Sequence, residues 1–314
     1  MRRNPLWALT VVVLLLGSAC SGSGSGPQGQ EPPSSGTSLG GTKTPDANPT
    51  PDVREGAVTK LLVFVVENHS FDQVRDGMPY TFKLAERFGY AANYYALTHP
   101  SLPNYIGITG GQTYGITDDD PPSSHPVDGQ SVFGQALALG KTARVYAEGM
   151  PNNCATEDGG DKYAVRHNPW TYFVSEQESC KANDVPIGDL GPAVADGTLP
   201  NIGMVVPDMC NIAHDCDLSV ADAWFKDHMS RIFDGPDWRS GHLAVVLTAD
   251  EDDSSQNNQI LTVVIHPSQQ GNVVDQRLNH YSLTRLYEDV VHAPHLYEAR
   301  SAASMSDAFG LPIN

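Results

Sequence analysis

Positively charged side chains are scarce in this chain. Its 314 residues contain 19 lysines and arginines against 37 aspartates and glutamates, which gives a formal net charge of −18 at pH 7. Nonspecific binding to nucleic acid needs a basic surface, so we expect no nucleic-acid partner. An anionic phosphate ester would need local positive charge in its site, and a divalent metal ion is the most economical source.

The apolar run near the N-terminus is too short to remain as a membrane-spanning helix. It extends from Leu6 to Leu16, follows Arg2 and Arg3, and precedes small residues that end at Cys20. Such a pattern is typical of an export signal. The residues before Cys20 resemble a bacterial lipobox. Lipidation of Cys20 would anchor the protein to the outer face of the cell membrane, unless it is released. The alternative is an ordinary secretory signal peptide cut nearby.

Residues 21–56 lack the apolar side chains of a folded core. In residues 21–55, 23 positions are Ser, Gly, Pro or Thr. Such a segment cannot offset its ordering entropy and is expected to be a disordered tether. Folding therefore concerns residues 57–314, about 258 residues, which is a usual size for one domain. We expect this domain to be a monomer.

Beyond Cys20, the chain has four cysteines and no CxxC pair. The missing pair disfavours a metal site built from four thiolates. An even number of cysteines in an exported chain indicates disulfides instead. Four cysteines allow three pairings, and sequence proximity alone favours Cys154 with Cys180 and Cys210 with Cys216.

Four apolar runs rich in β-branched residues predict strands that are buried on both faces. They are residues 61–66, 202–206, 243–248 and 260–265. Two further segments, 220–233 and 282–293, carry apolar residues at helical spacing. Strands that alternate with helices predict an α/β fold with a mostly parallel sheet.

Polar side chains follow three of these strands, at the point where each strand ends: Glu67 with Asn68, Asp208, and Asp250 with Glu251. In open α/β sheets, ligands bind beyond the carboxyl ends of the strands. Carboxylates gathered at one edge repel each other, and a bound cation would relieve that repulsion. The alternative is a set of unrelated helix caps and turn residues.

Ser101 is the candidate nucleophile, although the chain lacks the GxSxG elbow of a serine hydrolase. Pro100 and Pro103 restrict the backbone on either side of it. A serine hydroxyl hardly ionises near neutral pH, and metal coordination both lowers its pKa and holds its oxygen for attack. The alternative is a rigid loop with a purely structural role.

Six segments carry a resemblance to a known family: VFVVENHSFDQV, THPSLPNYIGITGG, YAVRHNPWTYF, VVPDMCNIAHDCDLSVADAW, LTADEDD and NHYSLTRLYED. In this order they resemble the motifs of the bacterial phosphoesterase family, which contains secreted acid phosphatases and phospholipases C. The resemblance covers Thr59 to Gly310, and mycobacterial secreted acid phosphatases are the most similar in size. It implies a three-layer αβα sandwich with a mostly parallel central sheet and an alkaline-phosphatase-like core.

The resemblance also implies a set of metal ligands: Glu67, Asn68, Ser101, Asp250, Glu251 and, for a second ion, Asp208 and His214. The family commonly has other residue types where this chain has Glu251, which leaves the role of Glu251 open. Oxygen-rich ligands with one or two histidines do not select among zinc, calcium, magnesium and manganese.

The same resemblance assigns Asn68, Asn104 and His167 to the substrate phosphate. Ser101 would attack phosphorus, and His167 or His280 would assist the leaving group as an acid.

Several of these residues also have structural alternatives. Asp208 would cap the turn after its strand, and His214 would pack inside a disulfide loop. His280 would begin the last predicted helix, and His167 would be a turn residue. Asp252, which follows the acidic pair, is expected to be solvated.

The combined prediction is an exported, metal-dependent acid phosphatase that hydrolyses phosphate monoesters, phosphoinositides among them, through a phosphoserine intermediate. Its partners would be the ester and the membrane that holds its lipid anchor. One alternative is a phospholipase C-type phosphodiesterase, which the lack of a long C-terminal extension disfavours. Another is a lipoprotein that binds phosphate or metal without catalysis.

Overall fold

The computed structural model describes residues 56–313. The predicted signal peptide, the lipidation site at Cys20 and all of the predicted tether except Gly56 lie outside the described residues. Within residues 56–313, no helix has both the length and the apolar character that crossing a membrane requires.

A nine-stranded sheet forms the centre of the described residues, in the order β4-β3-β5-β1-β6-β7-β2-β8, with β9 paired to β2. Only β7 runs antiparallel to its neighbours. The strands are β1 (Lys60–Val66), β2 (Gly89–Tyr95), β3 (Ala143–Ala147), β4 (Asp184–Pro186), β5 (Ile202–Val206), β6 (Leu243–Ala249), β7 (Gln259–Ile265), β8 (Asn272–Val274) and β9 (Leu278–Asn279).

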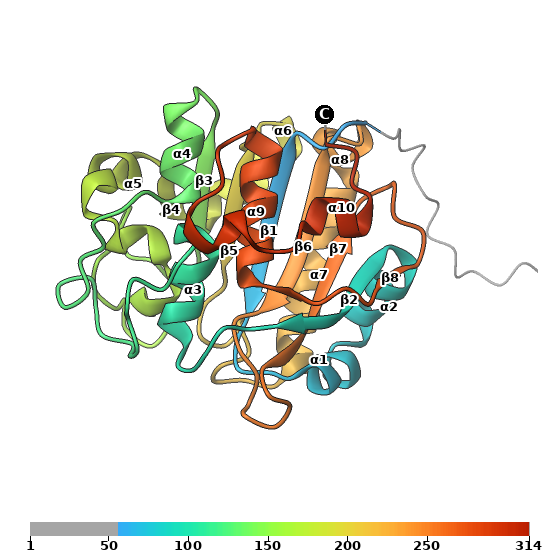
Figure 1. Ribbon diagram of the computed structural model, residues 1–314, viewed down its shortest axis with the longest axis horizontal. Helices are drawn as coiled ribbons and strands as arrows, with labels where there is room; N and C mark the ends of the chain where they lie inside the picture. The colour runs from blue at the N-terminus through green and yellow to red at the C-terminus, as the bar shows by residue number, and fades with distance from the viewer. Residues whose placement is uncertain (1–55, 314) are drawn as a thin grey trace, which may run out of the picture. The chain divides into compact units, whose positions relative to one another are not determined.

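Helices cover both faces of this sheet (Figure 1). One layer contains α1 (Phe71–Gly77), α2 (Pro79–Arg87), α6 (Leu190–Asp196), α7 (Leu218–Asp234) and α8 (Pro236–Arg239). The other contains α3 (Ser101–Gly110), α4 (Val132–Ala138), α9 (His280–Val291) and α10 (Met305–Phe309), and α5 (Gln177–Asn183) packs near β4. Short 3-10 helices are η1 (Val165–His167), η2 (Pro169–Tyr172), η3 (Val174–Glu176), η4 (Ile187–Asp189) and η5 (Tyr297–Arg300).

The predicted α/β class and the mostly parallel sheet are confirmed. The four apolar runs form β1, β5, β6 and β7, whose side chains are almost all buried because helices lie on both faces. The two amphipathic segments correspond to α7 and α9. β1 lies between β5 and β6, so three strands that end in polar residues are neighbours in the sheet.

Ser101 begins a helix, which the sequence analysis did not predict. Pro100 is the N-cap of α3 and Pro103 lies in its first turn. The N–H groups of a first turn have no partner within the helix, so the missing N–H of proline costs little there. Gly111, with φ of 71°, ends the helix in the left-handed conformation that glycine adopts readily. Every side chain of α3 is buried, so its N-terminus is firmly placed.

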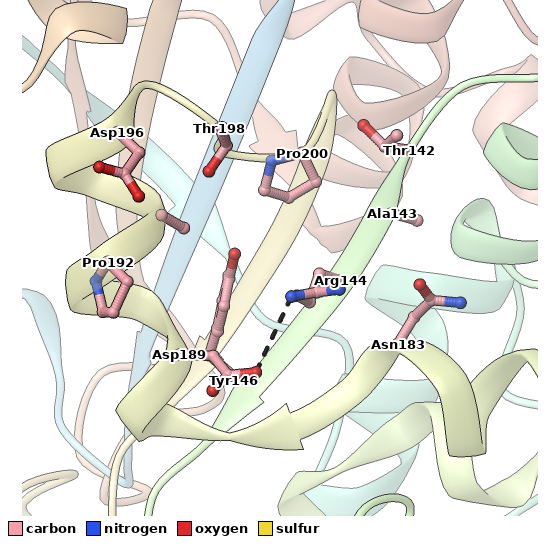
Figure 2. Close-up of a pocket in the computed structure, with 11 residues that line it drawn as sticks. Thr142, Ala143, Arg144, Tyr146, Asn183, Asp189, Pro192, Asp196, Thr198 and Pro200 are labelled. Atoms are coloured by element: carbon pink, nitrogen blue, oxygen red, sulfur yellow. Dashed lines mark ion pairs between the residues drawn. The ribbon is translucent and has the colours of Figure 1, made fainter.

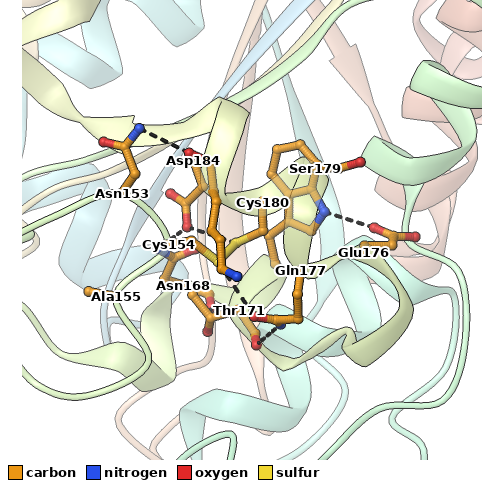
Figure 3. Close-up of a disulfide and its surroundings, with 12 residues drawn as sticks. Asn153, Cys154, Ala155, Asn168, Thr171, Glu176, Gln177, Ser179, Cys180 and Asp184 are labelled. Carbon is orange, nitrogen blue, oxygen red and sulfur yellow. Dashed lines mark hydrogen bonds between the residues drawn. A yellow bond between two sulfur atoms is a disulfide. The ribbon is translucent and has the colours of Figure 1, made fainter.

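Both favoured disulfides are present, one between Cys154 and Cys180 and the other between Cys210 and Cys216. Figure 3 shows the first, which joins α5 to the segment after β3, with Asp184 beside it. Asp184 is buried, and its Oδ2 lies 3.5 Å from Cys180 Sγ. Disulfides are typical of exported proteins.

Candidate active site

The acidic residues that follow β1 and β6 lie side by side at the carboxyl end of the sheet. The two strands are parallel neighbours in register, with Val66 opposite Ala249. Glu67 and Asp250 come next on each strand, and both are fully buried. The Asn68 N–H donates to Asp250 Oδ1 at 3.0 Å, which ties the two strand ends together. The register of the sheet therefore brings two carboxyl groups to one place.

Four polar side chains surround the Glu67 carboxyl group. Oε2 accepts hydrogen bonds from Ser101 Oγ at 3.2 Å and from Asn68 Nδ2 at 3.1 Å. Oε1 accepts one from the Tyr105 hydroxyl at 3.1 Å and lies 3.0 Å from His167 Nε2. Burial raises the pKa of Glu67, and the surrounding groups offset this only in part. A carboxyl group with a raised pKa is a better proton acceptor.

Ser101 reaches this carboxyl group because it is the first residue of α3. The Ser101 side chain also interacts with Asp250. Burial raises the pKa of Asp250, and a hydrogen bond from the Ser101 hydroxyl is one of the contacts that lower it. The N-terminus of a helix presents unpaired N–H groups and partial positive charge, which favour an anion. One of these groups, the Leu102 N–H, already donates to Asp119 Oδ1 at 2.9 Å.

Asp250 has a carboxylate oxygen without a partner. Its Oδ1 accepts from the Glu251 N–H at 2.7 Å, but its buried Oδ2 has no hydrogen bond within residues 56–313. Burial, followed by the neighbouring Glu67, raises the pKa of Asp250 well above its ordinary value. Burial also raises the pKa of Glu251 to about 10, with Asp250 and Glu67 as the next causes. Three carboxyl groups are thus held where their charged forms repel each other.

These residues fit a divalent cation. Carboxylate and hydroxyl oxygens are ligands for calcium, magnesium, manganese and zinc. Glu67, Asp250 and Ser101 supply such oxygens at one edge of the sheet, and the unpaired Oδ2 of Asp250 is an available ligand atom. A cation there would also offset the repulsion that contributes to the raised pKa values.

Glu251 is held by residues on either side of Ser101. Asn104 Nδ2 donates to Glu251 Oε2 at 3.0 Å, and His99 Nδ1 lies 3.2 Å from Oε1. Asn104 Oδ1 accepts from two backbone N–H groups of the preceding loop. The side chain of Asn104, which the resemblance assigns to phosphate, therefore ties this loop to Glu251.

His167 is buried against Tyr105 and Glu67. Its ring stacks on Tyr105 with centroids 5.3 Å apart, and its Nε2 contacts Glu67 without the geometry of a hydrogen bond. Burial lowers the pKa of His167 well below its ordinary value, with Arg166 and His214 as the next causes. The ring is therefore neutral near pH 7, and a neutral ring can hydrogen-bond to a phosphoryl group but is not an imidazolium acid.

His280 lies behind Asp250 at the start of α9. Its Nε2–H donates to the Asp250 backbone carbonyl at 2.6 Å, so its Nδ1 is free to accept from the Tyr94 hydroxyl at 3.3 Å. Burial lowers the pKa of His280 to about 4, although the contact with Asp250 opposes this. Since both ring nitrogens are occupied, the structure gives His280 a positioning role and not that of the leaving-group acid.

Asp208 serves as a turn cap in this structure. Its Oδ1 accepts from the N–H groups of Cys210 and Asn211 at 3.1 and 2.9 Å, and its Oδ2 lies 3.4 Å from Lys162 Nζ. This corresponds to the structural alternative for Asp208. Within residues 56–313, no hydrogen bond or ion pair joins Asp208 to His214, and each side chain has other partners.

His214 lies at the rim of the Glu67 site. Its Nε2 is 3.2 Å from an Arg166 guanidinium nitrogen, and its Nδ1 is 2.7 Å from Asp215 Oδ1. Its ring centroid lies 6.2 Å from that of His167. His214 Nε2 accepts from Arg166 and so helps to hold this guanidinium, whose N–H donors lie toward the space where an anionic ester would lie.

Sequence reasoning missed the contributions of Tyr105 and His99. Tyr105 follows Ser101 by four residues, which puts both on one face of a helix, so an expected helix would have revealed it. His99 Nε2 lies 3.1 Å from Asp252 Oδ1, and its other ring nitrogen faces Glu251. The expectation that Asp252 is solvated is wrong, because it is 1% exposed and held by these contacts.

Comparison with known proteins identifies the family. The model of the Phosphoesterase family matches residues 74–294, which is more than half of the chain. This chain belongs to the Phosphoesterase family. It is therefore a hydrolase that acts on phosphoric ester bonds, as predicted.

Curated relatives of this family member are phosphatases. It is 28% identical over 256 residues to a phosphatidylinositol-3-phosphatase of Mycobacterium tuberculosis, a match that covers 80% of this chain and 82% of that protein. It is also 28% identical over 259 residues to a probable acid phosphatase of Kluyveromyces lactis, covering 78% of this chain. The match spans only 61% of the length of that fungal relative.

Solved structures support the predicted alkaline-phosphatase-like core. A Vibrio parahaemolyticus protein of the alkaline phosphatase superfamily superposes with a TM-score of 0.53, covering 82% of this chain and 74% of its own. Its sequence identity is 10%, so this likeness concerns the fold alone.

Proposed function

We propose that this chain is an exported, metal-dependent acid phosphatase that hydrolyses phosphate monoesters through a phosphoserine intermediate. The observation that carries the proposal is the Ser101 hydroxyl, 3.2 Å from buried Glu67 at the N-terminus of a buried helix. The names of the relatives support monoesters, and that of the mycobacterial relative makes phosphoinositides a lipid class to assay.

Ser101 is the nucleophile of the proposed reaction. Its hydroxyl hydrogen points to Glu67 Oε2, whose raised pKa favours proton acceptance. The Ser101 oxygen attacks phosphorus, the ester bond to the alcohol breaks, and the alcohol leaves with a proton taken from solvent water. Water then attacks the phosphoserine, releasing inorganic phosphate and restoring the hydroxyl. A divalent cation held by Glu67, Asp250 and Ser101 would supply positive charge that favours the serine alkoxide and the transferring phosphoryl group.

Nitrogen donors around the site bind and orient the phosphoryl group. Neutral His167 offers its buried Nε2, which has no hydrogen-bond partner in the described part of the chain. Arg166 and His214 stand next to it and offset the negative charge of the transferring group. Asn68 occupies the other side, where its backbone and side chain hold Asp250 and Glu67 in place.

Export and anchoring complete the proposal. Two disulfides among the described residues support an oxidising compartment. A Cys20→Ser variant should lose its lipid label and leave the membrane fraction, whereas a protein that stays in that fraction unlabelled would contradict the lipid anchor.

The proposed function is tested by comparing the rates at which the protein hydrolyses p-nitrophenyl phosphate, bis-(p-nitrophenyl) phosphate and phosphoinositide vesicles. Each rate is measured with and without a chelator. We expect turnover of the monoester, loss in chelator, and a loss of about 10³-fold or more in Ser101→Ala. Ser175→Ala, which removes an exposed hydroxyl bonded only to a loop carbonyl, is the matched control. Faster hydrolysis of the diester would favour a phospholipase C-type enzyme. Phosphate binding without turnover of any ester would favour a binding lipoprotein.

A further inference from the structure

A cavity of about 500 Å³ opens beside the candidate active site. Its lining includes His69 and Gln73 from the segment after β1, and His214, Asp215 and Asp217 from the disulfide loop before α7. Volumes of this order are usual for small-ligand pockets. Another cavity, of about 400 Å³, is lined by residues of β3, η4 and α6, including the Arg144–Asp189 ion pair at 3.9 Å (Figure 2). It contains none of the candidate catalytic residues.

The larger cavity lies next to the residues of the reaction centre. His69 follows Asn68 directly, and its Nδ1 contacts the backbone carbonyl of Glu67. His214 approaches Arg166 at 3.2 Å, and its ring centroid lies 6.2 Å from that of His167. The phosphoryl group would occupy the buried centre, so the alcohol of the ester must extend outward. The cavity is the space available beside that centre.

The lining of this cavity is polar and carries negative charge. It contains two carboxylates and no lysine or arginine. Asp215 is paired with the His214 ring at 2.7 Å. Asp217 occupies the N-cap position of α7 but makes no side-chain capping hydrogen bond, so its carboxylate is available to a ligand. Gln73 adds an amide, and Leu218 adds a small apolar wall.

We propose that this cavity binds the alcohol portion of the substrate and selects alcohols that carry hydroxyl or amine groups but no second anionic group. This rests on the proposed function. Carboxylates accept hydrogen bonds from hydroxyl and ammonium groups, whereas they repel a second phosphate or carboxylate at short range. At partly screened surface sites, each close charge is worth roughly five- to tenfold in kcat/KM.

Three small monoesters of similar size test this selection. The alcohols released from O-phosphoethanolamine, glycerol 3-phosphate and 3-phosphoglycerate carry charges of about +1, 0 and −1 near neutral pH. We expect kcat/KM to fall in that order, by roughly five- to tenfold at each step in low salt. Salt at about 0.5 M should reduce the differences in kcat/KM among the three esters, because it screens the charges. The alcohol of phosphatidylinositol 3-phosphate keeps an anionic phosphodiester, so it should be a poor substrate for this chain.

The double variant Asp215→Asn/Asp217→Asn should collapse the ratio between the first and last ester to within about threefold. Asparagine at 215 keeps an oxygen that accepts from His214. The matched control Asp196→Asn/Asp234→Asn makes the same change in net charge at exposed positions near the opposite ends of the strands and should keep the full ratio. The control matters because a net charge of −18 repels every anion.

If the ratio of kcat/KM between O-phosphoethanolamine and 3-phosphoglycerate were the same in the double variant and in the control, the proposed selection would be overturned. Continued turnover of p-nitrophenyl phosphate would then show that the proposed function still stands. A flat series in the wild-type protein would also overturn it. If the wild-type protein hydrolyses no ester at all, including p-nitrophenyl phosphate, the proposed function fails and the selection fails with it.

Discussion

Two of the regions where this protein buries carboxyl groups differ in their surroundings. At the carboxyl end of the sheet, Glu67, Asp250 and Glu251 lie close enough for their charges to raise one another's pKa. Beside the Cys154–Cys180 disulfide, Asp184 is hydrogen-bonded to the Asn168 amide (Figure 3). Burial raises the pKa of Asp184 to about 8, and no second acid contributes to the shift.

This difference separates a structural acid from a binding site. One proton neutralises Asp184, which then sits in an uncharged setting with the Asn168 amide at 2.8 Å. Three neighbouring acids would need three protons, and a divalent cation neutralises such a group with fewer species. Asp184 and Asp250 each have a buried oxygen without a partner among the described residues, so the number of neighbouring acids is what supports the proposed metal site.

The largest expected effect comes from replacing one acid in each region. Asp250→Asn keeps an oxygen that accepts from the Asn68 and Glu251 N–H groups but removes the charge, so we expect kcat to fall by about 10²–10⁴-fold. Asp184→Asn makes the same change beside the disulfide and should leave kcat within about twofold. Steady-state kinetics of the two purified variants make the comparison. Equal losses would show that the two regions do not differ in the way described.

The dependence of unfolding free energy on pH tests the raised pKa of Asp184, the isolated acid of the comparison. The ordinary pKa of Asp184 is 3.8 and its folded value is about 8, so the folded state holds an extra proton between these pH values. Stability from this group is therefore full below about pH 4 and is lost as the pH rises towards 8. Denaturant unfolding at several pH values, with divalent cation present, should show a shallower decline in Asp184→Asn than in the wild-type protein. Parallel curves would contradict the raised pKa.

A smaller effect is expected from His280. His280→Phe leaves the buried Asp250 carbonyl without its donor, which should cost about 1–3 kcal/mol of unfolding free energy and lower kcat roughly tenfold. His280→Gln keeps an N–H donor and should recover most of the activity. If the pH profile of the glutamine variant lost its alkaline limb, the fall in rate at high pH, His280 would be a proton donor after all.

The smallest effect is expected from Asp208. Asp208→Asn can still accept from the Cys210 and Asn211 N–H groups, so stability should change by less than about 0.5 kcal/mol and activity by less than about twofold. Thermal unfolding and an ester assay measure both. A loss of about 10²-fold in activity would return Asp208 to the list of metal ligands.

Much of the fold was predictable because the hydrophobic runs are long and buried on both faces. β1 and β6 end where their apolar residues end, and the parallel sheet then brings Glu67 and Asp250 together. The nearness of Ser101 to these acids agrees with the proposed shared site. Disulfide partners close in sequence were also correctly favoured.

The rest depends on orientations that sequence spacing does not determine. Asp208 follows β5 as Glu67 follows β1, yet its side chain turns back to cap its own loop. His280 has the right position in the family motif, but its ring faces a backbone carbonyl. Asp252 is buried, and its carboxylate accepts from N–H groups of its own loop and contacts His99, which lies far away in sequence. Tertiary contacts of this kind are invisible in a linear pattern of residue types.

The central claim is that Glu67 and Asp250 hold one divalent cation beside the Ser101 hydroxyl. Its most direct test is the metal content and monoesterase activity of the purified protein before and after exhaustive chelation, with Asp250→Asn and Asp184→Asn alongside. We predict about one tightly held divalent ion per chain in the wild-type protein and Asp184→Asn, none in Asp250→Asn, and activity that is lost and restored with the ion. Full activity in protein that contains no metal would contradict the account.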